Sequence, residues 1–164
     1  MTQDLERRLA RLEAAEAIRT LIGRYAEGAD RRNDPALMRP LFADDAVWEA
    51  AGFGRFTGGD VIADELARIG REQIVWTMHY MVSPVIEPGA DGHTARAGWS
   101  LWELAKVADQ GKEVAEHGEE AADHWIAGVY DADLRREGDG WVFTRVTLTV
   151  TLLTPRNRDW RPLA

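Results

Sequence analysis

Residues 75–87, VWTMHYMVSPVIE, are the first of four segments in which apolar and polar residues alternate. The others are HTARAGWSLWELAKV at 93–107, ADHWIAGVYDADLRR at 122–136 and WVFTRVTLTVTLL at 141–153. A period of two residues is typical of β-strands that bury one face. Turn-forming residues join the first two segments (PGADG, 88–92) and the last two (EGDG, 137–140). We therefore expect an antiparallel meander of four long strands.

The N-terminal part of the chain has helical spacing instead. Apolar residues recur at steps of three and four, which predicts one long amphipathic helix from about residue 4 to about residue 31. These residues are Leu5, Leu9, Leu12, Ile18, Leu21, Ile22, Tyr25 and Ala29.

Shorter elements are expected between this helix and the strands. Asp34 and Pro35 have the pattern of an N-cap followed by proline, and Pro40 should keep this second helix short. Residues 45–50 are expected to form a strand. The sequence TGGD at 57–60 has capping-box spacing and predicts a third helix that ends near Gly70.

Helices followed by an antiparallel sheet indicate an α+β fold in one domain, residues 1–164, with residues 154–164 as a C-terminal tail. The long helix should cover one face of the sheet. If the sheet curves strongly, a cone-shaped cavity remains between sheet and helices. The polar segment 108–120, ADQGKEVAEHGEE, is a candidate flexible loop over the mouth of that cavity.

Composition excludes several classes of function. The chain of 164 residues has no cysteine, which excludes thiol nucleophiles, cysteine-ligated zinc, iron–sulfur clusters and disulfides. Its net charge of −8 and scattered basic residues argue against nucleic acid and anionic membranes as partners. No apolar run has the length of a membrane span or a secretory signal, so a cytoplasmic protein is expected.

Metal and cofactor motifs are not found. The four histidines lack ligand spacing, no HExxH occurs, and no glycine-rich phosphate-binding motif follows a predicted strand. We expect no metal site and a reaction that needs no cofactor.

Three short stretches carry a resemblance to a known group of proteins. They are Gly28-Ala29-Asp30-Arg31-Arg32, with Tyr25 upstream; the segment 52–58, GFGRFTG; and the segment 77–80, TMHY. Together with the order of elements, they resemble the SnoaL-like branch of the nuclear-transport-factor-two-like superfamily. Within it they are similar to scytalone dehydratase, bile-acid 7-alpha-dehydratase and hexachlorocyclohexane dehydrochlorinase. The resemblance implies a cone-shaped α+β barrel with a strongly curved, mostly antiparallel sheet.

In the resembling lyases, an aspartate on the helix and a histidine on a strand form a dyad, which implies catalytic roles for Asp30 and His79. An imidazole can take a proton at neutral pH, and a carboxylate on its other nitrogen fixes the tautomer. Tyr25 matches the dehydratase position and would assist the leaving oxygen. The alternatives are a surface carboxylate at Asp30 paired with Arg31 or Arg32, and packing roles for His79 and Tyr25.

Five further residues are candidate walls of a substrate pocket. Arg145 is in the strand where the dehydrochlorinase supplies an arginine, although it is shifted by one position, which on a strand reverses the face. His124 alternates with Ile126 along its strand. The remaining candidates are aromatic, and for these, as for Phe56, core packing is the alternative: Trp48, Phe53 and Trp102.

We therefore expect a lyase that acts on a small hydrophobic molecule, aromatic or polycyclic among the options. Water elimination comes first, followed by dehydrohalogenation, retro-aldol loss, and isomerisation or cyclisation on the same dyad. The alternatives are a non-catalytic binding or assembly module and the small subunit of a ring-hydroxylating oxygenase. The resemblance also implies a homodimer or homotrimer formed through the exposed sheet face.

Overall fold

The computed structural model describes residues 2–108 and 121–157, in which helices come first and pack on one sheet. The elements are α1 (Thr2–Asp30), α2 (Pro35–Met38), a 3-10 turn (Arg39–Leu41), β1 (Phe42–Ala50), β2 (Gly54–Thr57), α3 (Gly59–Glu72), β3 (Ile74–Pro88), β4 (Thr94–Ala108), β5 (Ala121–Glu137) and β6 (Gly140–Pro155). The predicted α+β class is confirmed. Two predicted features lie outside the described residues. They are the loop 108–120 with His117, of which only Ala108 is described, and Trp160 and Pro162 of the tail.

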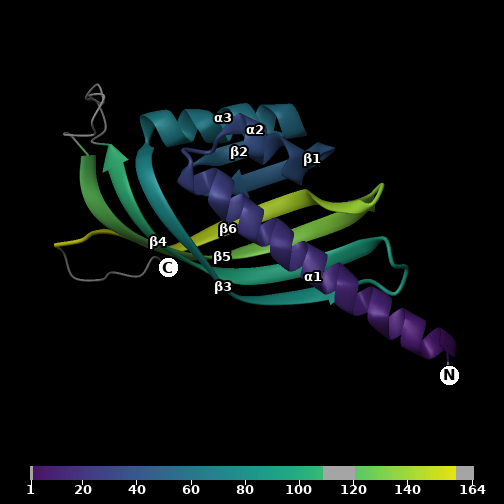
Figure 1. Cartoon of the computed structure of the whole chain (residues 1–164). Coiled ribbons are helices and arrows are strands. Elements are labelled where there is room, and N and C mark those ends of the chain that lie inside the picture. Colours follow the sequence, from purple (N-terminus) through teal and green to yellow (C-terminus); the bar gives the residue numbers. More distant parts are fainter. Residues whose placement is uncertain (1, 109–120, 158–164) are drawn as a thin grey trace.

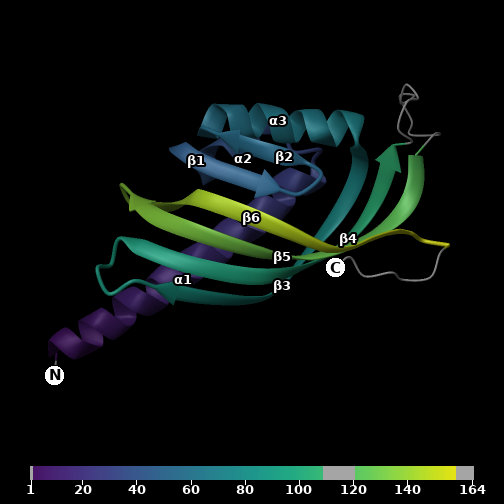
Figure 2. The same cartoon turned by 180° about the vertical axis from the view of Figure 1, so that it is seen from behind.

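The sheet has six strands in the order β2-β1-β6-β5-β4-β3. The meander β3 to β6 is antiparallel as predicted, whereas β1 lies parallel to β6. The sheet curls strongly but does not close into a barrel. α1 crosses its concave face, and α2 and α3 lie near the C-terminal end of α1 (Figure 1, and from behind in Figure 2). The concave face is therefore covered mainly by helices.

The structure corrects the predicted start of α3 and confirms that of α2. Residues 54–57 form the edge strand β2, which pairs with β1, so Thr57 lies opposite Val47 in the ladder. Because Thr57 is held in a strand, it does not cap the helix. Gly58, with φ of 98°, is the N-cap and no side chain caps this end. The predicted cap of α2 is confirmed, since the Asp34 carboxylate accepts a hydrogen bond from the Ala36 amide at 2.9 Å.

The apolar residues of α1 do not share one face, contrary to the prediction. Ile18, Ile22 and Tyr25 are buried against the sheet, while three leucines of the first turns are exposed. Successive residues are rotated by about 100° around the helix axis, so the mean direction of the three leucines lies roughly 150° from that of the buried residues. The six-residue step from Leu12 to Ile18 causes this change of face. Only the second half of α1 therefore contributes to the core.

The core lies between the concave face of the sheet, α1 and α3. Aromatic rings dominate it: Tyr25 packs edge-on against Phe42 and Phe143, and Trp99 stacks on Tyr130 with ring centroids 5.0 Å apart. Strand alternation places Trp99, Leu101 and Glu103 of β4 on the concave face, where all three are buried. Glu103 is therefore a carboxyl group in a mostly apolar layer.

Candidate functional site

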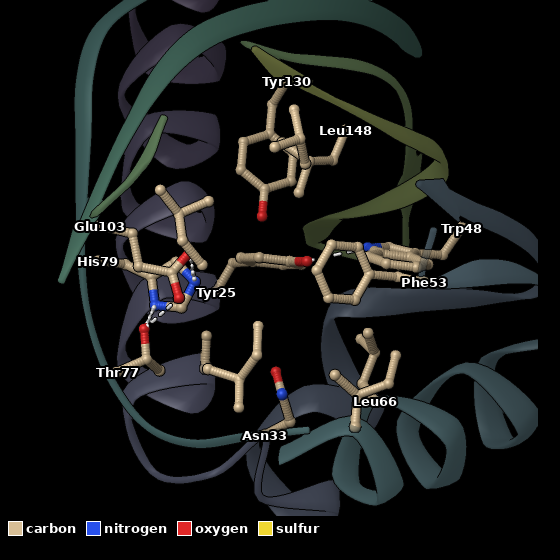
Figure 3. A pocket seen from close by; sticks show the side chains of 15 residues that line it. Tyr25, Asn33, Trp48, Phe53, Leu66, Thr77, His79, Glu103, Tyr130 and Leu148 are labelled. Carbon is tan, nitrogen blue, oxygen red and sulfur yellow. Dashed lines mark hydrogen bonds and ion pairs between the residues drawn. The ribbon is translucent and has the colours of Figure 1, made fainter. Parts of the chain in front are cut away.

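A cavity lies between α1, α3, β1 and the concave face of the sheet. Its free volume is about 50 Å³. Most of its wall is apolar, with polar side chains gathered from α1, β3 and β4 (Figure 3). The described lining residues are Tyr25, Ala29, Asn33, Trp48, Phe53, Leu66, Ile69, Ile74, Thr77, His79, Glu103, Ile126, Tyr130, Leu148 and Val150.

Asp30 is placed by the way α1 ends. Gly28 allows the last turn to pack closely on α2, because an added Cβ would lie 2.6 Å from the Met38 sulfur. The chain then reverses through Arg32 and Asn33, both with positive φ. The Asp30 carboxylate is thereby directed at β3, while Arg31 pairs with Glu27 instead of Asp30. Asp30 therefore does not form the alternative surface ion pair with Arg31.

Asp30 and His79 contact each other directly. One carboxylate oxygen, Asp30 Oδ1, lies 2.8 Å from His79 Nδ1 and accepts the backbone N–H of His79 at 2.8 Å. The His79 side chain is 9% exposed and that of Asp30 34% exposed. A proton on Nδ1 satisfies this contact, so the tautomer it favours leaves the lone pair on Nε2. The geometry suits a base that accepts a proton at Nε2.

Glu103 faces the other side of the same imidazole, and the sequence analysis missed it. Its Oε2 lies 3.5 Å from His79 Nε2, and its Oε1 accepts a hydrogen bond from the Thr77 hydroxyl at 2.5 Å. Burial raises the pKa of Glu103, an effect that the charges of His79 and the Thr77 bond only partly offset. Its position in the sequence could have indicated this role: Glu103 is two residues from Leu101 and four from Trp99, so on a strand it shares their inward face.

The aromatic end of the cavity is built around Tyr25. The Trp48 indole N–H donates a hydrogen bond of 2.9 Å to the Tyr25 hydroxyl oxygen, and both side chains are buried. Burial raises the pKa of Tyr25 to about 12, so its hydroxyl keeps the proton at neutral pH. In Figure 3 this hydroxyl points toward Trp48 and away from His79. Tyr130 and Asn33 add polar atoms that the sequence analysis did not single out.

The expected pocket residues divide into two groups. Trp48 and Phe53 line the cavity, whereas Phe56 stacks on Trp48 behind it, with ring centroids 5.7 Å apart. Trp102 is corrected: strand alternation turns it to the convex face of the sheet, where it stacks on Trp125 at 5.3 Å. This pairing of two tryptophans lies outside the cavity.

His124 and Arg145 are also corrected, since neither lines the cavity. His124 shares a strand face with Ile126, but its Nδ1 contacts the carbonyl oxygen of Ala122 at 2.9 Å. β6 bulges beside Arg145, so that Phe143 and Val146 both face inward and Arg145 faces out. There it bonds to Asp131 and Asp133 at 2.7 and 2.8 Å. No lysine or arginine lines the described part of the cavity wall.

Two features are absent from the part of the chain that the structure describes. None of the helices is long and apolar enough to cross a membrane. Among residues 2–108 and 121–157, no group of three or more His, Asp or Glu side chains is arranged to hold a metal ion.

Comparison with known proteins identifies relatives by family and fold. A family model described as a SnoaL-like domain matches residues 10–147. A comparison with curated protein sequences gives no match. Among solved structures, a hexachlorocyclohexane dehydrochlorinase, LinA type 2, is similar with a TM-score of 0.77 and 21% identity, covering 94% of this chain and 97% of that one.

Two further solved structures come from Novosphingobium. The LinA-type3 dehydrochlorinase of Novosphingobium barchaimii LL02 has a TM-score of 0.75 and 20% identity, covering 94% of this chain and 99% of its own. A candidate scytalone dehydratase of Novosphingobium aromaticivorans DSM 12444 has a TM-score of 0.71 and 21% identity, covering 93% and 95%. At these identities, the likeness shows a shared fold.

Proposed function

This chain belongs to the SnoaL-like domain family, and from that premise we propose that it is a cofactor-independent lyase that eliminates water from a small, neutral, largely apolar molecule. The observation that carries the proposal is His79, held between Asp30 and Glu103 at the wall of an apolar cavity. A binding module needs no imidazole oriented in this way. The solved relatives with dehydrochlorinase and dehydratase names support the same class of reaction.

The proposed reaction begins at His79. Nε2 takes a proton from a carbon of the substrate, the C–H electrons form a C=C bond, and the C–O bond breaks. Asp30 stabilises the imidazolium through Nδ1, at 2.8 Å. A base positioned in this way contributes about a hundred- to ten-thousand-fold in rate.

The leaving hydroxide needs a proton, and Glu103 is the group suited to supply it. Burial raises its pKa, which suits a general acid, and because the Thr77 hydroxyl donates to Oε1, a proton on this carboxyl belongs on Oε2, which faces His79 Nε2. After water has left, the imidazolium returns its proton to the Glu103 carboxylate, and the site is reset. Tyr25 assists by donating a hydrogen bond to an oxygen of the substrate.

The character of the cavity supports a neutral, small substrate. Its described wall carries the carboxyl of Glu103 but no lysine or arginine, so an anionic substrate would find no cation to pair with. The free volume of about 50 Å³ holds only a few waters, so any substrate must displace part of the wall, and a small substrate requires less displacement than a polycyclic one. Dehydrohalogenation, retro-aldol loss and isomerisation or cyclisation begin with the same proton abstraction and are the alternatives on this site.

The test uses a panel of small cyclic β-hydroxyketones, because water loss gives a conjugated ketone that absorbs in the ultraviolet. We expect turnover by the wild type and a loss of about a hundred- to ten-thousand-fold in His79→Ala. His124→Ala is the matched control, since His124 lies outside the cavity. Activity that survives His79→Ala would refute the mechanism, and binding of panel members without turnover would favour the ligand-binding alternative.

Assembly through the sheet remains part of the proposal. Large apolar side chains on β3 and β5 are exposed on the described surface, among them Trp76, Tyr80, Val82 and Val129 at 43–48%. An apolar patch of this kind is typical of a protein interface. We propose that it is the contact of the expected homodimer or homotrimer.

A further inference from the structure

The first turns of α1 carry a row of leucines on the side that faces away from the sheet. Leu5, Leu9 and Leu12 are 64%, 53% and 69% exposed. The side of the same turns that faces the β3–β4 hairpin lines a groove with Arg7 and Arg11 instead, and Arg8 and Glu13, between this side and the leucines, also line it. In Figure 1 this part of α1 projects beyond the body of the protein. Single exposed leucines are ordinary, but three aligned on one helix indicate an interaction surface.

The spacing of this leucine row matches the seam of a coiled coil. Steps of four and three residues place Leu5 and Leu12 at d positions and Leu9 at an a position. Arg8 then occupies a g position, while Glu6 and Glu13 occupy e positions. Within the described residues, neither Arg8 nor Glu13 takes part in an ion pair. The flanks of the seam therefore carry charges that are free to select a partner.

These charges fit a second copy of the same helix in parallel. In a parallel pair, each g residue lies beside the e residue five positions further along the other helix, so Arg8 meets Glu13 of the second copy, twice by symmetry. An antiparallel pair would place the e positions, Glu6 and Glu13, opposite each other. Glutamates beside the seam also disfavour an anionic membrane as the partner.

We propose that the N-terminal turns of α1 pair in parallel with those of a second copy of this chain, burying the leucine row between them. The leucines and the buried face of α1 point in nearly opposite directions, so the two protein bodies lie on opposite sides of the paired helices and do not collide. The seam runs from Leu5 to Leu12, little more than one heptad, which is short for a coiled coil, so the association depends on protein concentration. This contact is separate from the sheet face and does not depend on the enzymatic proposal.

The absence of cysteine from the sequence permits a direct test by cross-linking. In a parallel pair, two Leu12→Cys chains bring their thiols together at a d position, within reach of a disulfide. Ala10→Cys is the matched control, because Ala10 is exposed on the groove side of the same helix. Under mild oxidation, we expect the full-length Leu12→Cys chain to form a covalent dimer much faster than Ala10→Cys. Equal rates, or no dimer from Leu12→Cys, would overturn the proposal.

A second measurement uses the charges at the seam. Sedimentation equilibrium should show that Leu9→Glu removes one step of association, halving the mass of the assembly at a concentration where the wild type is associated. Arg8→Glu and Glu13→Arg should each weaken association, and the double variant should restore it. An unchanged mass for Leu9→Glu, or a double variant no better than the single ones, would contradict parallel pairing.

Discussion

Removing the hydroxyl of Tyr25 perturbs the aromatic end of the cavity without removing a ring. In Tyr25→Phe the edge-on contacts with Phe42 and Phe143 remain, but the Trp48 indole N–H loses its acceptor at 2.9 Å. Trp48 is 3% exposed, so water cannot easily replace that acceptor. Leaving a buried donor unpaired costs about 1–3 kcal/mol. For a chain of this size, that corresponds to a fall in melting temperature of about 2–12 °C.

The assay is urea and thermal unfolding of Tyr25→Phe beside the control Tyr80→Phe. Tyr80 is 46% exposed and its hydroxyl contacts only the Met78 sulfur among the described residues, so its removal should change stability by less than about 0.5 kcal/mol. A double-mutant cycle with Trp48→Phe isolates this hydrogen bond, because the bond between Tyr25 and Tyr130 is lost with and without the indole and cancels in the cycle. The reasoning fails if Tyr25→Phe is as stable as Tyr80→Phe, or if the cycle shows no coupling.

Two further predictions concern charged groups. Burial raises the pKa of Glu103, so above pH 4.5 the unfolded chain binds fewer protons than the folded one, and this carboxyl destabilises the fold as the pH rises. The gain in unfolding free energy from Glu103→Gln, measured in urea, should therefore be larger at pH 7 than below pH 4.5. An equal gain at both pH values would contradict the raised pKa. Arg145→Gln removes partly exposed ion pairs with Asp131 and Asp133, so we expect the free energy of unfolding to fall by about 1 kcal/mol or less. Turnover of any substrate of the panel should not change. A large loss of turnover would show that Arg145 belongs to the site.

The fold followed from periodicity to a large extent. Alternation and turn residues predicted the antiparallel meander, and the change to helical spacing predicted α1 and α3. The parallel contact between β1 and β6 joins segments distant in sequence, which no local pattern encodes. The two faces of α1 were missed because steps of three and four within each half conceal the six-residue step between Leu12 and Ile18.

The resemblance of three short stretches to known lyases predicted that Asp30 and His79 form a pair. These residues, from α1 and β3, do meet in the structure. Arg145 and Trp102 failed because a bulge and strand parity decide which face a residue occupies. Glu103 was missed because a glutamate on a strand is ordinarily exposed to solvent, although its position two residues from Leu101 and four from Trp99 placed it on the inward face.

The most direct test of the account is an NMR measurement of the histidine ring nitrogens in the wild type and in Asp30→Asn. We predict that neutral His79 of the wild type shows a single fixed tautomer with the proton on Nδ1, and that Asp30→Asn removes this preference, while the tautomers of His124 and His93 are unaffected. If His79 of the wild type populates both tautomers and does not respond to Asp30→Asn, the proposed elimination mechanism is wrong.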